Sequence, residues 1–136
     1  MNDPIYNLAQ IFKKLPGIGE RQAFRITYDI LSKDASFAES LIDQLKKIRA
    51  TTALCPQCFR YYINDNILIC DICSNPKTLK NTLLIVERDT DLTAIVRTGI
   101  YKGLYFVLGG SVPILEKEPE KKVRLKELFK RVEDLV

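Results

Sequence analysis

Four cysteines have the clearest chemical potential in this sequence. They form two C-x-x-C pairs separated by eleven residues: Cys55 and Cys58, then Cys70 and Cys73. Two such pairs can bring four thiolates into a tetrahedron around one Zn²⁺, because each C-x-x-C turn directs both of its sulfurs toward the same point. The sequence therefore predicts one zinc ion per chain. Protein groups would fill all four coordination positions, so we expect this zinc to be structural and not catalytic.

Two other uses of paired cysteines stay open on spacing alone: a redox C-x-x-C and a pair of disulfides. A redox motif needs only one C-x-x-C, so a second matched pair exceeds its requirement. The N-terminal stretch MNDPIYNLAQ has no basic segment followed by an apolar run, so no secretory signal is expected. We therefore expect the reducing cytoplasm, where structural disulfides are rare. The sequence has no histidine, which excludes Ser-His-Asp and Cys-His catalytic arrangements.

A second candidate site lies near the N-terminus, in the segment LPGIG at residues 15–19. Its glycines permit a tight turn and a close approach of the backbone to a partner. The N–H groups that begin the following helix suit a phosphate. The residues expected to contact nucleic acid are Lys13, Lys14, Gly17, Gly19, Arg21 and Arg25. The alternative is a plain helical hairpin with glycine in its loop.

The charge balance permits nucleic-acid binding without requiring it. The chain has 136 residues, with 21 Lys and Arg against 17 Asp and Glu, for a net charge of +4. Contacts to phosphates carry little sequence information and weaken with salt, so we expect binding to single- and double-stranded DNA without sequence specificity. The basic residues of segment 121–131 are interspersed with glutamates and are expected to form a solvated helix face. No apolar run is long enough to cross a membrane.

Apolar residues at helical spacing outline the elements that must position these residues. They predict helices over residues 4–14 and 20–32, a third helix begun by a capping box of Ser36 with Glu39, and a last helix near residues 125–132. The residues of the third helix expected to face inward are Leu41, Ile42, Leu45 and Ile48. Between the cysteine pairs, residues 60–63 and 67–69 are expected to form a hairpin. Tyr61 and Tyr62 are expected to pack beside the zinc and not to stack on bases.

The segment after the cysteines has the pattern of a parallel sheet. Residues 81–86 contain a continuous apolar run, Leu83 to Val86, which predicts a strand buried on both faces. A helix over about 90–97 and a strand over 104–108 complete a β-α-β unit with a right-handed crossover. The predicted fold class is α+β with several modules. We expect a helical helix-hairpin-helix domain over 1–51, a four-cysteine zinc finger over 52–78, and a partial α/β domain with parallel strands over 79–136.

The order of these motifs resembles that of the RecR family of bacterial recombination mediators. The hairpin LPGIG comes first, the four-cysteine finger second, and the run LLIVERDTDLTAIVRTGIYKGLYFVLGG third. That run is similar to the first half of the family's Toprim domain, and the resemblance covers about residues 5–110. Phe106 stands where the family often has a histidine. The later strands and D-x-D motif of a whole Toprim domain do not follow, so we expect either a fragment or a shortened protein.

The resemblance implies a function. RecR-like proteins are non-catalytic DNA-binding mediators of recombinational repair, which act with RecO and RecF to help load RecA at single-stranded gaps. The resemblance places the four cysteines at the zinc ligands, and Arg21 and Arg25 at the basic positions after the hairpin. It places Glu87 at the Toprim glutamate, a candidate for partner binding. It also implies a homo-oligomer, with a dimer through the N-terminal region, in the bacterial cytoplasm near the nucleoid.

Two other functions stay open. The first is a Mg²⁺-dependent Toprim nuclease or primase-like enzyme, since Glu87, Asp89 and Asp91 lie within five residues. Catalytic Toprim enzymes take their glutamate and D-x-D from different strands, so this cluster argues against catalysis; Asp89 or Thr90 is instead expected to cap a helix. The second is a zinc-ribbon protein-interaction module that binds no DNA.

Overall fold

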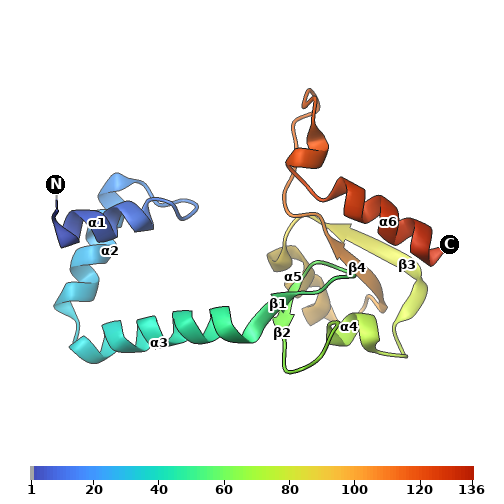
Figure 1. Ribbon diagram of the computed structural model, residues 1–136, viewed down its shortest axis with the longest axis horizontal. Helices are drawn as coiled ribbons and strands as arrows, with labels where there is room; N and C mark the ends of the chain where they lie inside the picture. The colour runs from blue at the N-terminus through green and yellow to red at the C-terminus, as the bar shows by residue number, and fades with distance from the viewer. Residues whose placement is uncertain (1) are drawn as a thin grey trace. The chain divides into compact units, whose positions relative to one another are not determined.

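The computed structural model describes residues 2–136 and contains two compact units, Met1–Ala50 and Thr51–Val136 (Figure 1). Helices α1 (Pro4–Phe12), α2 (Glu20–Ser32) and most of α3 (Ala35–Thr51) form the first unit. The second unit holds the cysteines and the parallel strands. The predicted α+β fold class is confirmed, whereas the division into three modules stays a prediction. Within residues 2–136, no helix combines the length and apolar character needed to cross a membrane.

Helices α1 and α2 form the expected hairpin. Asp3 caps α1 by accepting a hydrogen bond from the Ile5 N–H at 3.0 Å, and Pro4 occupies the first turn, where its missing N–H costs nothing. Small residues are buried between the two helices: Ala9 on α1, and Ala23 and Thr27 on α2. Their small size lets the two backbones approach closely, so the helices before and after the LPGIG turn pack directly against each other.

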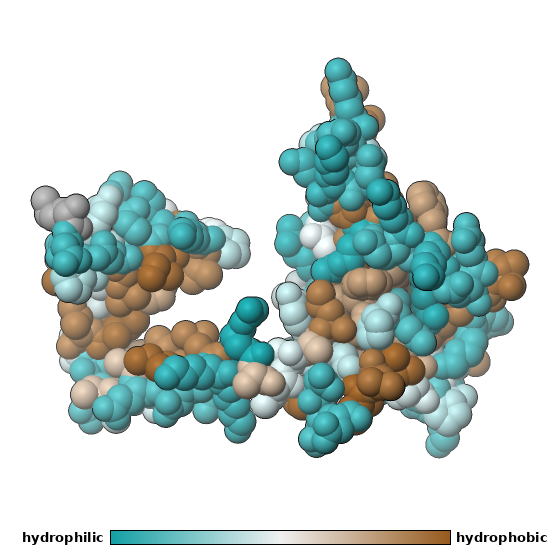
Figure 2. Space-filling view, in the orientation of Figure 1, coloured by the Kyte–Doolittle hydropathy of each residue, from teal (hydrophilic) through white to brown (hydrophobic). Residues whose placement is uncertain are grey.

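Helix α3 differs from the sequence-based expectation in two ways. It begins at Ala35, so Ser36 lies inside the helix, where its hydroxyl hydrogen-bonds to the carboxylate of Asp34 at 3.1 Å instead of capping. None of its seventeen residues, all of which the structure describes, is buried. The four residues expected to face inward are 36–56% exposed: Leu41, Ile42, Leu45 and Ile48. They form an apolar surface along α3 because α1 and α2 pack against each other and leave it uncovered (Figure 2).

The cysteine segment contains strands β1 (Thr52–Leu54) and β2 (Tyr61–Ile63) and the short helix α4 (Asp71–Ser74). The two strands are antiparallel, with Thr52 opposite Ile63. The expected hairpin of residues 60–63 with 67–69 is therefore wrong. The first cysteine pair turns the chain back on itself, and the Cys55 N–H donates to the Arg60 carbonyl at 2.8 Å, so β2 returns to the strand that precedes the cysteines.

The β-α-β unit is present as predicted. Strand β3 (Leu79–Val86), helix α5 (Asp89–Thr98) and strand β4 (Gly103–Val107) follow in order, and the strands are parallel, with Val86 opposite Val107. All of β4 is buried, and the cysteine segment packs against it through Cys58 and Phe59, whereas Val86 is the one buried residue of β3. The expectation that β3 is buried on both faces is therefore wrong.

The C-terminal segment follows β4 and is part of the second unit. It contains a 3-10 turn, η1 (Pro119–Lys121), and helix α6 (Leu125–Leu135). Leu128 is buried, whereas Phe129 and Val132 on the same apolar face are exposed. The predicted amphipathic helix is therefore present, with part of its apolar face uncovered.

Two tyrosines at β4 differ in how their hydroxyls are satisfied. Tyr101 donates to the Leu104 carbonyl at 2.8 Å. Tyr105 is 2% exposed, and its hydroxyl has no hydrogen-bond partner in the described part of the chain. Burial also raises the pKa of this phenol, with a smaller contribution from Tyr101, so it stays neutral. A buried unpaired hydroxyl costs roughly 1–3 kcal/mol, so its removal should not destabilise the fold.

We expect Tyr105→Phe to leave the free energy of unfolding unchanged or to raise it by about 1 kcal/mol, because the lost hydroxyl makes no hydrogen bond. Tyr101→Phe, the matched control, should lower it by about 1 kcal/mol through loss of its bond to Leu104. Urea unfolding of the three proteins measures both changes. A loss of stability in Tyr105→Phe equal to that in Tyr101→Phe would contradict the packing described here.

Candidate functional site

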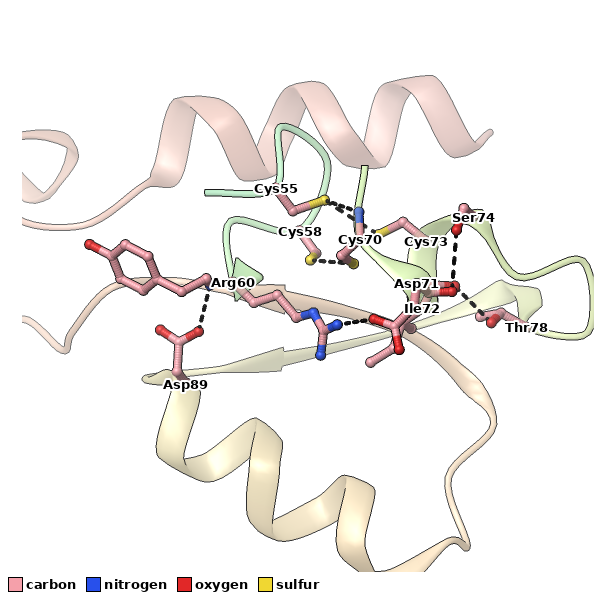
Figure 3. A network of polar contacts seen from close by, with 11 residues as sticks. Cys55, Cys58, Arg60, Cys70, Asp71, Ile72, Cys73, Ser74, Thr78 and Asp89 are labelled. Atoms are coloured by element: carbon pink, nitrogen blue, oxygen red, sulfur yellow. Dashed lines mark hydrogen bonds and ion pairs between the residues drawn. The ribbon is translucent and has the colours of Figure 1, made fainter. Parts of the chain in front are cut away.

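The structure brings the four cysteines together at one buried point. Cys55 and Cys58 lie on the turn after β1, while Cys70 and Cys73 lie at the start and near the end of the turn of α4 (Figure 3). Their sulfurs all lie within 4.8 Å of one another, and the residues are 0–6% exposed. Among residues 2–136, this is the one cluster of three or more cysteine or acidic side chains placed to hold a metal ion.

The spacing of the sulfurs matches a four-thiolate site. The Sγ atoms of Cys58 and Cys70 are 3.5 Å apart, and those of Cys55 and Cys73 are 3.9 Å apart. A tetrahedron of Zn–S bonds of about 2.3 Å places its sulfurs roughly 3.8 Å apart. A disulfide needs about 2.05 Å, and all four cysteines are free. The donor set therefore suits a soft divalent cation and leaves no position for a substrate.

Hydrogen bonds among the four thiols shift their pKa values in opposite directions. The pKa of Cys55 is lowered, chiefly by its hydrogen bond with Cys58, and the pKa of Cys58 is raised, chiefly by that same bond. Without metal, one sulfur can carry charge only while a neighbour keeps its proton. A divalent cation removes this restriction because it neutralises thiolates directly, so metal binding would release protons.

The cysteine segment is fastened to the parallel sheet by its own backbone. The Cys58 carbonyl accepts a hydrogen bond from the Val107 N–H of β4 at 2.8 Å. The next residue, Phe59, has a φ of 61° and packs its ring against Phe106, with centroids 5.6 Å apart. The Arg124 guanidinium lies over the same ring at 5.3 Å and donates to the Val107 carbonyl at 2.8 Å. Sequence reasoning missed Phe59 and Arg124, since only their spatial contacts reveal this joint.

A second joint involves the acidic cluster after β3. Asp89 accepts a hydrogen bond from the Tyr61 N–H of β2 at 2.9 Å, which ties the cysteine segment to the start of α5. Asp91 caps α5 by accepting from the Arg88 N–H at 3.1 Å, so the expectation that Asp89 or Thr90 caps this helix is wrong. Glu87 is exposed at the end of β3 and pairs with Arg88 at 3.5 Å. Glu87 and Asp91 therefore contact the side chain and the backbone N–H of Arg88, respectively, whereas Asp89 contacts Tyr61.

The two tyrosines of β2 have different surroundings. Tyr62 packs against the cysteine cluster, and its hydroxyl donates to the Ile67 carbonyl at 2.6 Å. Tyr61 is exposed and is not one of the residues packed against the cluster. The expected packing beside the cysteines is therefore present for Tyr62 and wrong for Tyr61.

The N-terminal hairpin presents a tight turn at its tip. The Ile18 N–H donates to the Leu15 carbonyl at 3.3 Å, with Pro16 and Gly17 between them. Gly17 has a φ of +77°, as the third position of a type II turn requires. Gly19 caps α2 with an extended backbone, and a Cβ added there would meet no atom within 4 Å. The fold itself therefore does not require glycine at position 19.

The four cations predicted at this hairpin are all exposed. Lys13 and Lys14 lie just after α1, while Arg21 and Arg25 lie one turn apart on α2. Gly19 has no side chain to cap α2, so the N–H groups of the first turn of α2 receive no hydrogen bond from an N-cap side chain. The structure thus places all six predicted residues on the end of α1, the turn, and the first half of α2.

Two family models match separate parts of the chain. The family model described as RecR, helix-hairpin-helix matches residues 5–49, and the Toprim domain model matches residues 81–133. The chain is 36% identical over 129 residues to the recombination protein RecR of Endomicrobium trichonymphae, covering 95% of this chain and 64% of that one. It is 38% identical over 125 residues to the RecR protein of Brachyspira hyodysenteriae, covering 92% of this chain and 61% of that one. The chain thus spans slightly less than two thirds of these relatives, and it belongs to the RecR family.

Proposed function

We propose that this chain is a non-catalytic, DNA-binding mediator of recombinational repair. One observation carries the proposal: the turn of its helix-hairpin-helix has a glycine, Gly19, that the fold does not need, beside four exposed cations. The relatives bear the name recombination protein. By analogy with the resemblance described above, the chain would act with RecO and RecF to help load RecA at single-stranded gaps, in the cytoplasm near the nucleoid.

The proposed DNA contact is made to phosphates. The N–H groups at the start of α2 can donate to an anion, and the helix dipole favours negative charge there. The missing side chain at Gly19 lets the phosphate reach these groups, while Arg21 and Arg25 add two charges on the same helix. Such contacts do not read bases, so the chain binds both single- and double-stranded DNA, and the DNA sequence has little effect on affinity.

The proposed cofactor is one structural Zn²⁺ held by Cys55, Cys58, Cys70 and Cys73. The sulfur separations and the burial of the cluster support this choice. When bound, zinc supplies charge neutralisation and crosslinks the two halves of a segment that is too small to have its own core. In the second unit, this segment then holds β4 through Cys58 and α5 through Tyr61.

Two of the proposed protein partners have a candidate contact surface on the chain. A second copy of the chain would cover the apolar surface of the first unit, where Phe37, Leu41 and Leu45 follow one another along α3. Exposed contiguous apolar surfaces of this kind are typical of interfaces. The other partner is RecO, with Glu87 as a contact residue, because this carboxylate is exposed at the end of β3 with only an exposed arginine beside it.

We expect Arg21→Ala combined with Arg25→Ala to weaken DNA binding and to reduce the slope of log affinity against log salt by about 2, one for each lost phosphate contact. The unfolding temperature should not change, because both side chains are exposed. Fluorescence anisotropy with labelled DNA across a salt series measures the slope. The control is Lys126→Ala with Lys130→Ala, which removes the same charge from α6; an equal effect of both pairs would contradict the hairpin assignment.

We expect Gly19→Ser to weaken DNA binding while keeping the fold, because the new side chain meets no protein atom but occupies the path of the phosphate. Serine is also a better helix N-cap than glycine, so α2 should not lose stability. Anisotropy gives the affinity, and thermal unfolding gives the stability. Unchanged affinity in a folded Gly19→Ser protein would count against phosphate binding at this turn.

We expect Leu45→Glu to shift the chain from dimer to monomer, because a carboxylate on the apolar surface of α3 cannot be buried without a large desolvation cost. Gln44→Glu adds the same charge at the neighbouring exposed position and serves as the control. Sedimentation velocity at several protein concentrations measures the shift. If both variants have the same oligomeric state as the original chain, the proposed interface is wrong.

A further inference from the structure

Arg60 lies against the cysteine cluster in an arrangement that the zinc-ribbon pattern does not require. It follows the first cysteine pair and extends along the cluster toward α4, where it forms an ion pair with the Asp71 carboxylate (Figure 3). The Arg60 side chain is only 18% exposed, whereas that of Asp71 is 83% exposed. Its Nε is buried and has no hydrogen-bond partner among the described residues.

The cysteine cluster needs a compensating positive charge. Four thiolates around one divalent cation carry a net charge of −2, and the sulfurs are almost completely buried. Buried charge is costly unless it is paired or hydrogen-bonded. One backbone group helps, since the Cys70 N–H approaches the Cys55 sulfur at 3.5 Å. The nearby Lys80 donates to the carbonyls of Cys73 and Asn75 at 3.1 and 3.3 Å, so its charge is directed to the backbone.

The pKa of Arg60 reflects the negative charges beside its guanidinium. Burial alone would lower the pKa of its guanidinium, but the negative charges of Cys70 and Asp71, with a hydrogen bond to Cys70, outweigh burial and raise it. Asp71 is the residue directly after Cys70, so one guanidinium spans the thiolate and the neighbouring carboxylate. A planar guanidinium can contact both acceptors at once, which an ammonium group does less well.

We propose that Arg60 is a positioning residue of the metal site. Its guanidinium hydrogen-bonds to the Cys70 thiolate and is oriented by Asp71. This contact slows the release of the metal and the reaction of the Cys70 sulfur with electrophiles. The inference rests on the proposed zinc site. A hydrogen bond to a bound thiolate withdraws charge from sulfur, which makes it a weaker nucleophile and a poorer proton acceptor. Groups that orient metal ligands in this way typically change metal affinity by roughly 10–100-fold.

The experiment follows metal release from the full chain. Zinc-loaded protein is mixed with a chromogenic chelator, and release is compared in the original chain and in Arg60→Ala, Arg60→Gln and Arg60→Lys. We expect about 10-fold faster release from the alanine form, with partial rescue by glutamine, which keeps an N–H donor, and by lysine, which keeps the charge. Arg88→Ala is the control, because Arg88 is an exposed arginine of the same unit that pairs with Glu87.

A spectroscopic readout separates this role from a merely structural one. Cobalt(II) bound by four thiolates has sulfur-to-metal charge-transfer bands, and loss of the hydrogen bond to Cys70 should shift them in the alanine form while circular dichroism stays unchanged. If Arg60→Ala does not fold, the glutamine and lysine forms decide. Release rates and cobalt bands equal to those of the original chain in every folded variant would overturn the proposal. If the original chain binds neither zinc nor cobalt, the proposed metal site itself is wrong, and the role of Arg60 with it.

Discussion

Four sulfurs buried within 4.8 Å of one another are the constraint on which the second unit depends. Four thiolates in that space would repel one another, and four thiols would be poor hydrogen-bond partners. The segment around them cannot form a core of its own, since its packing partners are few: Tyr62, Ile69 and Ile72. A cation shared by the four sulfurs would satisfy all of these demands, and metal binding and local folding would then be one process.

The same constraint extends into the parallel sheet. The Cys58 carbonyl holds the Val107 N–H at one end of β4, and the Tyr61 N–H is held by Asp89 at the start of α5. Arg124 completes the joint by stacking on Phe59 and donating to the Val107 carbonyl. The cysteine segment thus braces the sheet at the end of β3 and β4 where Glu87 is exposed. The proposed DNA contact lies in the other unit, on residues that form no part of this joint.

The elements that could be predicted from sequence are those with local rules. The C-x-x-C spacing predicted the cysteine cluster, apolar runs predicted the parallel strands β3 and β4, and the glycines of LPGIG predicted the hairpin between α1 and α2. Pairing that depends on distant segments was not predictable. The partner of β2 proved to be β1, because the turn from Cys55 to Arg60 closes before any later strand can pair.

Side-chain roles were harder to predict than elements. Several acidic residues follow β3, and composition alone could not distinguish their roles. Asp91 caps α5, whereas Asp89 accepts a hydrogen bond from Tyr61 of β2. Leu41 and Leu45 have the spacing of a buried face, but periodicity cannot tell whether the same chain or another molecule covers it. Arg60 has no local signature, because its importance arises from the position of Cys70, which comes later in the chain.

The most direct test is the affinity of the purified chain for labelled single- and double-stranded DNA across a salt series, with metal content measured on the same sample. The account predicts one zinc per chain and binding to both forms of DNA that weakens steadily as salt increases. A chain that holds one zinc but binds neither form at low salt would contradict the proposed function and leave only a metal-stabilised scaffold.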